Sequence, residues 1–272
     1  MNIFSIITIN YNDKFGLEKT IKSIVNQDYK YFEFIIIDGG STDGSVSVIE
    51  NYQSQIQYWI SEKDSGVYNA MNKGIKVANG EFVLFMNSGD IFNNNNVLTQ
   101  VIPNLKKDFD IYYGDNYKVK NEHKRKKTYP EKLSFSFFYS SSINHQSTFI
   151  RKKLFHEHFF YNEEYKIASD WEFFIYTICK MNVPYKYLGV TICDYDFTGI
   201  SSSDKFRNLS KEEKATTIKK YFPLFEKDYE SLPLLTSKRI QQVVHVQKFP
   251  MAWKVLKAFI TVILIFIPKL KR

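Results

Sequence analysis

One stretch of the sequence, Phe32–Gly44, reads FEFIIIDGGSTDG and changes character halfway. Its first half is apolar apart from Glu33, as expected of a strand that is buried on both faces. Its second half consists of Asp, Gly, Ser and Thr, which are typical of a turn. In a parallel α/β sheet, ligands bind in the crevice beyond such strand ends.

The same pattern extends on both sides of this stretch. Ile3–Ile9 is a β-branched run that ends in the loop Asn10–Asp13, and Leu17, Ile21 and Ile24 then recur at helical spacing. Further strands are predicted at Gln57–Ile60, Glu81–Met86 and Asp110–Tyr113, with a helix at Val67–Ala78. This alternation over residues 1–115 predicts a doubly wound, nucleotide-binding half.

Four carboxylates follow the predicted strands: Asp38, Asp64, Asp90 and Asp115. The carboxyl ends of parallel strands share one edge of the sheet, so these side chains are expected to gather there. Like charges repel each other unless a cation or a ligand rich in hydrogen-bond donors lies among them. The alternative is that each Asp only stabilises a loop or caps a helix.

The motifs that are absent narrow the choice of ligand. The chain has neither G-x-x-x-x-G-K-[ST] nor G-x-G-x-x-G, so a P-loop NTPase and a dinucleotide oxidoreductase are unsupported. Without a phosphate-binding loop, a bound diphosphate needs a metal ion to neutralise it. An Asp on a turn after a strand supplies the oxygen ligand that Mg²⁺ or Mn²⁺ prefers, and Asp90 is the candidate.

The cysteines and the N-terminus indicate a cellular compartment. Cys179 and Cys193 are the two cysteines and lack CxxC spacing, which excludes a zinc ribbon and a disulfide framework. The first residues, MNIFSIITINYND, lack a basic region and a cleavage site, so they predict a strand and not a secretion signal. We therefore expect a reduced, cytoplasmic setting.

Charge is distributed unevenly along the chain. Residues 205–272 hold 15 Lys and Arg against 5 Asp and Glu, whereas residues 1–204 hold 22 against 24. A nucleic-acid enzyme would place its basic residues across the site, so no nucleic-acid partner is expected. A cationic terminus instead indicates an appendage that meets an anionic surface.

The end of the chain, Met251–Arg272, reads MAWKVLKAFITVILIFIPKLKR. A helix over about residues 251–267 would reach only about 25 Å, which is short for crossing a bilayer. Its basic flanks and Trp253 favour a helix that lies on an anionic cytoplasmic membrane surface. Core packing or a dimer contact is the alternative.

Several ordered motifs together resemble a known family. They are T-x-N-Y-N, I-I-D-G-G-S-T-D-G, S-E-K-D-S-G-V-Y-N-A-M-N-K-G-I and F-M-N-S-G-D within Phe4–Asp90, then N-H-Q-S-T-F-I-R-K-K-L-F (144–155) and A-S-D-W-E-F-F (168–174). With these motifs the chain resembles a family 2 glycosyltransferase, from the bacterial branch that builds exopolysaccharide, capsule and lipopolysaccharide. The resemblance spans about residues 1–200.

The resemblance implies an α/β fold of the GT-A type with a doubly wound, mostly parallel sheet. Residues 1–204 would form the glycosyltransferase domain, with a nucleotide-sugar half (1–115) and an acceptor half (116–204) that carries the catalytic base. Residues 205–272 would form a basic helical tail.

The family's donor site would place four residues against the nucleotide sugar. Tyr11 would stack on the base, Asp38 would accept a hydrogen bond from a ring N–H, Asp64 would help to hold the nucleoside, and Lys73 would meet a phosphate. The alternatives are a loop aromatic for Tyr11, a turn-stabilising side chain for Asp38 and a solvated helix residue for Lys73.

The metal motif departs from the family pattern. Members often carry D-x-D, but this chain has Ser88-Gly89-Asp90, so the first carboxylate is absent. Asp90 would then hold Mg²⁺ or Mn²⁺ with the diphosphate and water. His145 would add a ligand or touch the diphosphate, although a loop His is more often an ordinary hydrogen-bonding residue.

The resemblance places the catalytic base at Asp170, which would take the proton of the acceptor hydroxyl. Ser169-Asp170-Trp171-Glu172 also fits the capping box S-x-x-E, and the two interpretations are compatible. Trp171 is expected in the core or as a platform for the acceptor.

The function expected is that of an inverting glycosyltransferase, with a nucleoside diphosphate sugar, favoured as a UDP-sugar, as donor. The acceptor would be a lipid-linked or saccharide hydroxyl at the inner membrane surface. One alternative is a sugar-phosphate nucleotidyltransferase, although it would need a basic, Gly-rich loop near the first strand. The other is a catalytically degenerate sugar-nucleotide-binding scaffold, which the broken D-x-D favours.

Overall fold

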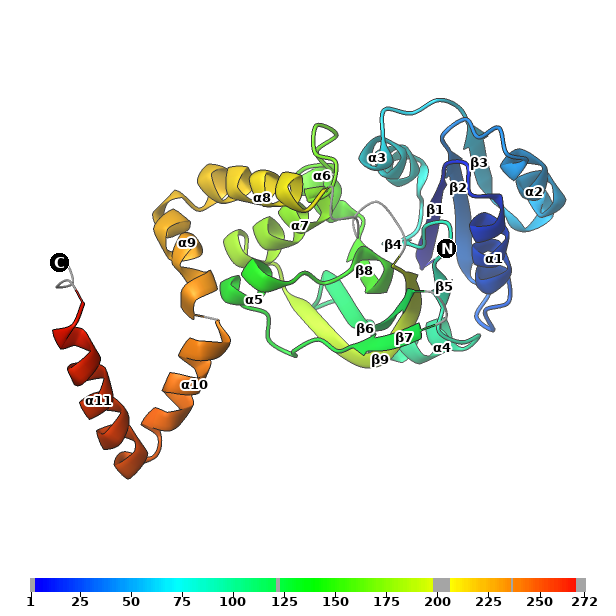
Figure 1. Cartoon of the computed structure of the whole chain (residues 1–272). Helices are drawn as coiled ribbons and strands as arrows, with labels where there is room; N and C mark the ends of the chain where they lie inside the picture. The colour runs from blue at the N-terminus through cyan, green and yellow to red at the C-terminus, as the bar shows by residue number, and fades with distance from the viewer. Residues whose placement is uncertain (1–2, 121–122, 198–205, 236, 268–272) are drawn as a thin grey trace. The chain divides into compact units, whose positions relative to one another are not determined.

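The centre of the protein is one mixed sheet, shown by a computed structural model that describes residues 3–120, 123–197, 206–235 and 237–267. The strand order is β3-β2-β1-β4-β8-β6-β9-β5, and β7 pairs with β6 outside this path (Figure 1). The strands are β1 (Phe4–Asn10), β2 (Phe32–Asp38), β3 (Tyr58–Ser61), β4 (Phe82–Phe85), β5 (Ile91–Phe92), β6 (Ile111–Lys120), β7 (His123–Lys127), β8 (Thr148–Arg151) and β9 (Tyr185–Asp196).

The helices connect and cover these strands. They are α1 (Lys14–Val25), α2 (Ser45–Asn51), α3 (Val67–Val77), α4 (Val97–Val101), α5 (Phe135–Ser140), α6 (Lys153–Glu157), α7 (Ser169–Ile175), α8 (Arg207–Tyr221), α9 (Glu226–Leu235), α10 (Lys238–Gln247) and α11 (Pro250–Ile265). The predicted alternation of strand and helix over the first part of the chain is therefore confirmed.

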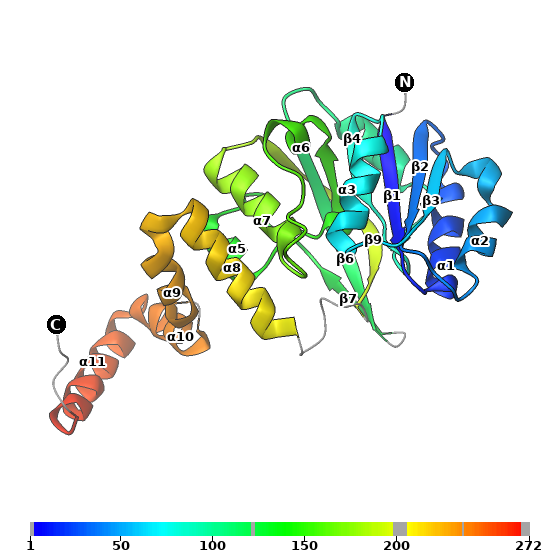
Figure 2. The same cartoon turned by 90° about the horizontal axis from the view of Figure 1, so that it is seen from above.

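The first four strands form a parallel sheet. Every residue of β1 is buried, because β2 and β4 flank it and helices cover both faces. Figures 1 and 2 show α3 on one face and α1 on the other, so this half is doubly wound as predicted. The parallel register of β1 and β2 pairs Asn10 with Asp38, which brings both side chains to the carboxyl edge of the sheet.

The second half of the sheet is mixed. β8 is antiparallel to both β4 and β6, so β6 runs in the same direction as β1–β4, and β9 is parallel to β6. β5 is antiparallel to β9, and β7 is antiparallel to β6, so only β5, β7 and β8 of the described strands oppose the others. Most strands therefore share one direction, which confirms the expected mostly parallel sheet.

The prediction for Asp115 is wrong. The strand near Asp110–Tyr113 does not end there, because β6 continues to Lys120 as one arm of a hairpin with β7. Asp115 therefore lies inside the strand, where its carboxylate accepts hydrogen bonds from Tyr129 N and Tyr187 Oη and lies 3.5 Å from Lys126 Nζ. It does not join the other carboxylates at the edge of the parallel strands.

The predicted capping box at Ser169 is also wrong. Ala168 precedes the first turn of α7 without a side-chain cap, and the Ser169 hydroxyl instead accepts the backbone N–H of Asn162 at 2.6 Å. A carboxylate from α8 instead bonds to the segment that precedes α7. Glu213 accepts the backbone N–H groups of Lys166, Ile167 and Ala168 at 2.7, 3.1 and 2.8 Å.

α8 packs on the first of two compact units of the chain. Besides Glu213, α8 buries Thr217 and Ile218. One compact unit extends through Phe222, and a second unit comprises residues 223–272.

The second unit contains α9, α10 and α11. The apolar run predicted as a helix over 251–267 is helical in α11, and its large apolar side chains are exposed, Met251, Val255, Phe259 and Ile265 among them. Among the described residues, no helix has the length and apolar character needed to span a membrane.

We predict that Glu213→Ala lowers the thermal unfolding temperature by roughly 4–8 °C. The change leaves three backbone N–H groups without their acceptor, which costs about 2 kcal/mol or more. The matched control is Glu212→Ala, because Glu212 is the exposed neighbour on the same helix and should unfold at the wild-type temperature. Equal unfolding temperatures for both variants, measured by calorimetry, would contradict the role of Glu213.

Candidate functional site

A cavity of about 590 Å³ lies at the carboxyl edge of the parallel strands. Its walls come from the ends of β1 and β4, the start of α3, the loop before β8, the start of α7, the end of β9, and α8. The residues expected at the site that line it are Tyr11, Asp64, Asp90, His145 and Asp170. The fold thus brings together five side chains that are spread over 160 residues of sequence.

Tyr11 and Asp64 meet at Gly39. A Cβ on Gly39 would stand 2.5 Å from Asp64 Oδ2 and 3.2 Å from Tyr11 Cδ2, so only glycine allows this close approach. Tyr11 is 67% exposed, which leaves its ring face open to a ligand. Asp64 is held by the backbone N–H of Gly66, 2.9 Å from its Oδ1. An aromatic face beside a carboxylate suits a nucleoside.

Asp38 and Lys73 do not line this cavity. The buried carboxylate of Asp38 accepts hydrogen bonds from Asn10 Nδ2 and from the hydroxyl groups of Ser41 and Ser61. It also accepts the backbone N–H groups of Gly40 and Ser41. Burial raises the pKa of Asp38, but these hydrogen bonds outweigh it and hold the pKa below its usual value. A ring N–H would reach this carboxylate only by displacing one of these donors.

Lys73 lies on α3 with its Nζ 2.6 Å from Glu62 Oε1. Its neighbour Asn72 is buried and joins α3 to Tyr161 through hydrogen bonds of 2.8 and 3.0 Å. The geometry therefore does not support the expected contact between Lys73 and a phosphate.

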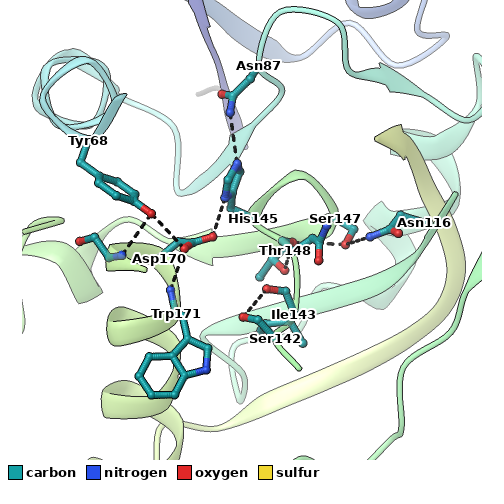
Figure 3. A network of polar contacts seen from close by, with 12 residues as sticks. Tyr68, Asn87, Asn116, Ser142, Ile143, His145, Ser147, Thr148, Asp170 and Trp171 are labelled. Atoms are coloured by element: carbon teal, nitrogen blue, oxygen red, sulfur yellow. Dashed lines mark hydrogen bonds and ion pairs between the residues drawn. The ribbon is translucent and has the colours of Figure 1, made fainter. Parts of the chain in front are cut away.

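Asp170 lies at the start of α7 and is held by three donors (Figure 3). Its Oδ1 accepts the Tyr68 hydroxyl at 3.2 Å and the backbone N–H of Trp171 at 2.8 Å. Its Oδ2 lies 2.8 Å from His145 Nδ1. Burial raises the pKa of Asp170, but the hydrogen bonds from His145, Trp171 and Tyr68 and the attraction of His145 outweigh it and lower the pKa. Asp170 is thus a carboxylate near neutral pH, as a base must be.

His145 stands between Asp170 and Asn87, as Figure 3 shows. Its Nε2 lies 3.2 Å from Asn87 Nδ2, and the hydrogen bond from that amide makes Nε2 the acceptor and Nδ1 the donor. Both ring nitrogens are therefore engaged, and the expected role of His145 as a metal ligand is not supported by this geometry. The ring instead orients the carboxylate of Asp170.

Asp90 is buried in the turn after β4. Its Oδ1 accepts the backbone N–H of Asp196 at 2.9 Å, and a Cβ on Gly89 would stand 2.9 Å from Asp196 Oδ2. Burial raises the pKa of Asp90 to about 7, although the Asp196 N–H, His145 and Gln146 act in the opposite direction. The end of β9 thus brings a second acidic side chain to the turn that lacks the first carboxylate of D-x-D.

The turn also carries an unsatisfied oxygen. Asn87 Oδ1 is buried and has no hydrogen-bond partner in the part of the chain that the structure describes. A carboxylate and a carboxamide oxygen in one turn are the hard donors that Mg²⁺ and Mn²⁺ bind, so Asp90 and Asn87 fit such an ion. The described residues contain no cluster of three His, Cys, Asp or Glu side chains that would hold a metal by themselves. The remaining ligands would therefore come from the diphosphate and water.

Several cavity residues were not expected from the sequence. They include Tyr68, Asn87 and Asp196, which no sequence pattern marked as site residues. Tyr68 and Asn87 do fall inside the motifs S-G-V-Y-N and F-M-N-S-G-D. Trp171 is buried, donates from its Nε1 to Phe138 O at 2.7 Å, and lines the cavity, so both of its expected roles are compatible with the structure. Lys214 comes from α8, which was assigned to the tail.

Comparison with known proteins identifies the family. The sequence profile described as Glycosyl transferase family 2 matches residues 5–167. The chain belongs to glycosyltransferase family 2.

Two of the similar proteins are named as glycosyltransferases. An uncharacterized glycosyltransferase of Mycobacterium tuberculosis is 31% identical over 207 residues, which are 73% of this chain and 76% of that protein. The Escherichia coli enzyme WfgD, named UDP-Glc:alpha-D-GlcNAc-diphosphoundecaprenol beta-1,3-glucosyltransferase, is 30% identical over 137 residues, which are 49% of this chain and 54% of WfgD.

Solved structures confirm the fold. Staphylococcus aureus TarS 1–349 in complex with UDP-GlcNAc matches with a TM-score of 0.66 and 20% identity, covering 90% of this chain and 76% of that one. The mannosyltransferase PcManGT of Pyrobaculum calidifontis, in complex with GDP-Man and Mn²⁺, matches with a TM-score of 0.62 and 15% identity, covering 98% of this chain and 76% of that one. The expected GT-A fold and nucleotide-sugar glycosyltransferase activity are confirmed, together with kinship to enzymes of bacterial cell-surface glycan synthesis.

Proposed function

We propose that this family 2 glycosyltransferase inverts the anomeric centre of a UDP-sugar and transfers the sugar to a hydroxyl of a lipid-linked acceptor. The observation that carries the proposal is the Asp170 carboxylate, which lines the cavity and is ionised and oriented by Tyr68, His145 and Trp171. The names of WfgD and of the TarS complex support uridine diphosphate as the leaving group, and the name of WfgD supports a lipid-linked acceptor.

Asp170 acts as the general base. Its carboxylate takes the proton of the acceptor hydroxyl while that oxygen attacks the anomeric carbon and the bond to the diphosphate breaks. A single displacement of this kind inverts the configuration at the anomeric carbon. The hydrogen bonds to Asp170 keep the carboxylate in one orientation during the attack.

Tyr11 and Asp64 bind the nucleoside in this proposal, and Asp90 and Asn87 bind a divalent cation. Mg²⁺ or Mn²⁺, when bound, stabilises the negative charge that develops on the leaving diphosphate. The Mn²⁺ complex of PcManGT supports this assignment.

The two alternatives expected from the sequence have less support. A sugar-phosphate nucleotidyltransferase needs a basic loop near β1, but the residues that follow β1 and line the cavity are Tyr11 and Asp13. A catalytically degenerate protein that only binds a sugar nucleotide does not need a carboxylate held by three hydrogen bonds beside the nucleotide-sugar site.

We also propose that α11 lies on the cytoplasmic membrane surface, where a lipid-linked acceptor is found. Its exposed apolar side chains are accompanied by Lys254 and Lys257, and residues 223–272 hold nine Lys and Arg against three Asp and Glu. An apolar helix with a cationic flank is attracted to anionic lipid headgroups.

We predict that Asp170→Asn lowers sugar transfer at least about 100-fold, because an amide does not take the hydroxyl proton. UDP affinity should be unchanged, since Asp170 serves the acceptor. Asp108→Asn, at an exposed carboxylate outside the cavity, is the matched control and should transfer at the wild-type rate. Wild-type turnover of Asp170→Asn in a radiolabelled-sugar assay would refute the assignment of the base.

We predict that UDP raises the unfolding temperature in the presence of Mn²⁺, and that Asp90→Asn loses this metal dependence. Ligand at about 100 times its dissociation constant contributes roughly 2.7 kcal/mol, or about 5–10 °C. GDP, CDP and dTDP serve as comparison nucleotides, and Asp108→Asn serves as the control variant. A shift in Asp90→Asn that still depends on Mn²⁺ to the same extent as in the wild type would exclude Asp90 as a metal ligand.

We predict that the chain sediments with phosphatidylglycerol vesicles and that deletion of residues 249–272 abolishes this binding. Lys254→Gln with Lys257→Gln should weaken it by about 30-fold, since each lysine contributes about 1 kcal/mol near an anionic surface. The control pair is Lys106→Gln with Lys107→Gln, at exposed lysines of the first unit. Sedimentation of the truncated chain at the wild-type level would show that α11 is not the membrane contact.

A further inference from the structure

Two lysines face the cavity without a role in the mechanism above. Lys166 precedes α7 and Lys214 lies on α8, and both line the cavity. Ser210, one helical turn before Lys214, lines it as well. These three side chains come from the wall that also carries Asp170 and Trp171.

The ammonium group of Lys214 lacks a counter-ion. It lies 5.0 Å from the centroid of the Trp171 ring, and no carboxylate in the described part of the chain forms an ion pair with it. Burial lowers the pKa of Lys214 even though the charge of Asp170 acts in the opposite direction. A partly buried cation without a partner is costly, unless a bound anion supplies the opposite charge.

α8 holds the two lysines on the same wall. Glu213, next to Lys214 in sequence, accepts the backbone N–H of Lys166 at 2.7 Å and those of the next two residues. Lys166 Nζ lies 4.0 Å from the position that a Cβ on Gly66 would take at the start of α3. Lys166 Nζ thus lies at the start of α3, whereas Ser210 and Lys214, one turn apart on α8, line the cavity beside Trp171. The hydrogen-bond donors of Ser210 and Lys214 suit the oxygens of a phosphate.

A third lysine lies behind this part of the cavity. Lys127, the last residue of β7, donates from its Nζ to Ser142 O at 2.8 Å and to Asn144 Oδ1 at 3.1 Å. Ser142 and Asn144 line the cavity, although Lys127 itself does not. Burial and the nearby charges of Lys118 and Lys214 lower the pKa of Lys127 to about 7, so this lysine adds only part of a positive charge near neutral pH.

The position of these residues indicates whether they bind the donor diphosphate or a phosphate of the acceptor. The donor's nucleoside and diphosphate belong with Tyr11, Asp64 and Asp90, at the ends of β1, β3 and β4. The acceptor hydroxyl must lie beside Asp170, because that carboxylate receives its proton. Lys214 lies over Trp171, the residue that follows Asp170, and therefore on the acceptor's side.

We propose that Ser210 and Lys214 bind a phosphate group of the acceptor, so that the enzyme takes a phosphate-linked sugar and not a neutral glycan. This inference rests on the proposed function, in which Asp170 serves the acceptor. It assigns a substrate contact to α8, which lies beyond the residues matched by the family.

The test is the binding of octyl phosphate to the full chain saturated with UDP and Mg²⁺, measured by ligand-observed NMR. 1-Octanol is the uncharged comparison probe. In Lys214→Met, which keeps the apolar part of the side chain, we expect the dissociation constant of octyl phosphate to rise at least about 10-fold, the loss typical of one charged hydrogen bond. The UDP affinity should remain at the wild-type value, and Lys214→Arg should restore octyl phosphate binding.

Lys73→Met is the matched control, because Lys73 pairs with Glu62 outside the cavity. Its octyl phosphate affinity and its unfolding temperature should equal those of the wild type, and Lys214→Met should unfold at the same temperature. Weaker UDP binding in Lys214→Met would assign the lysine to the donor diphosphate and overturn the inference. Equal affinities of wild type and Lys214→Met for octyl phosphate would also overturn it.

Failure of the proposed function has a different signature in the same experiment. A wild-type chain that binds none of UDP, GDP, CDP and dTDP is not a donor-dependent transferase, whatever it does with octyl phosphate. A wild-type chain that binds UDP but prefers 1-octanol to octyl phosphate keeps the proposed function and loses the phosphate site.

Discussion

The site depends on the buried carboxylate of Asp38, which closes the turn after β2. A carboxylate in the interior must find hydrogen-bond donors, because water no longer solvates it. Asp38 finds them in Asn10 at the end of β1, in Ser61 at the end of β3, and in its own turn. Three neighbouring strand ends are thereby tied together, and Gly39 is held where Tyr11 and Asp64 converge. The proposed nucleoside side of the cavity is thus held together by hydrogen bonds within the protein.

The acceptor side is built from more distant parts of the chain. Asp170 receives hydrogen bonds from Tyr68 on α3 and from His145 in the loop before β8, and His145 contacts Asn87 after β4. This chain of contacts joins both halves of the sheet across the cavity (Figure 3). The proposed base, fixed by groups from both halves, keeps its position relative to the proposed donor site, as a displacement at the anomeric carbon would require.

α8 completes this side. Its Glu213 holds the three residues that precede α7, and its Lys214 lies over Trp171. The family profile ends at residue 167, so α8 lies outside the residues that it matches.

The amino-acid sequence by itself determined the strands and helices of the parallel half, the GT-A fold, and the positions of Tyr11, Asp64, Asp90 and Asp170 at the cavity. The strands, helices and strand-end turns depend on local hydrophobic periodicity and on turn residues, which a short stretch of sequence specifies. The GT-A fold and the place of Asp170 were implied by the resemblance to family 2.

The partners of each side chain were decided only by the tertiary structure. Asp115 lies outside the cavity because β6 continues into a hairpin, and the Ser169 hydroxyl accepts the N–H of Asn162 and does not cap α7. The two ring nitrogens of His145 contact Asp170 and Asn87. Lys214 joined the cavity because α8 packs on the domain and not with the tail. Each of these contacts joins residues far apart in the chain, and only the packing of the whole sheet and its helices brings them within hydrogen-bond distance.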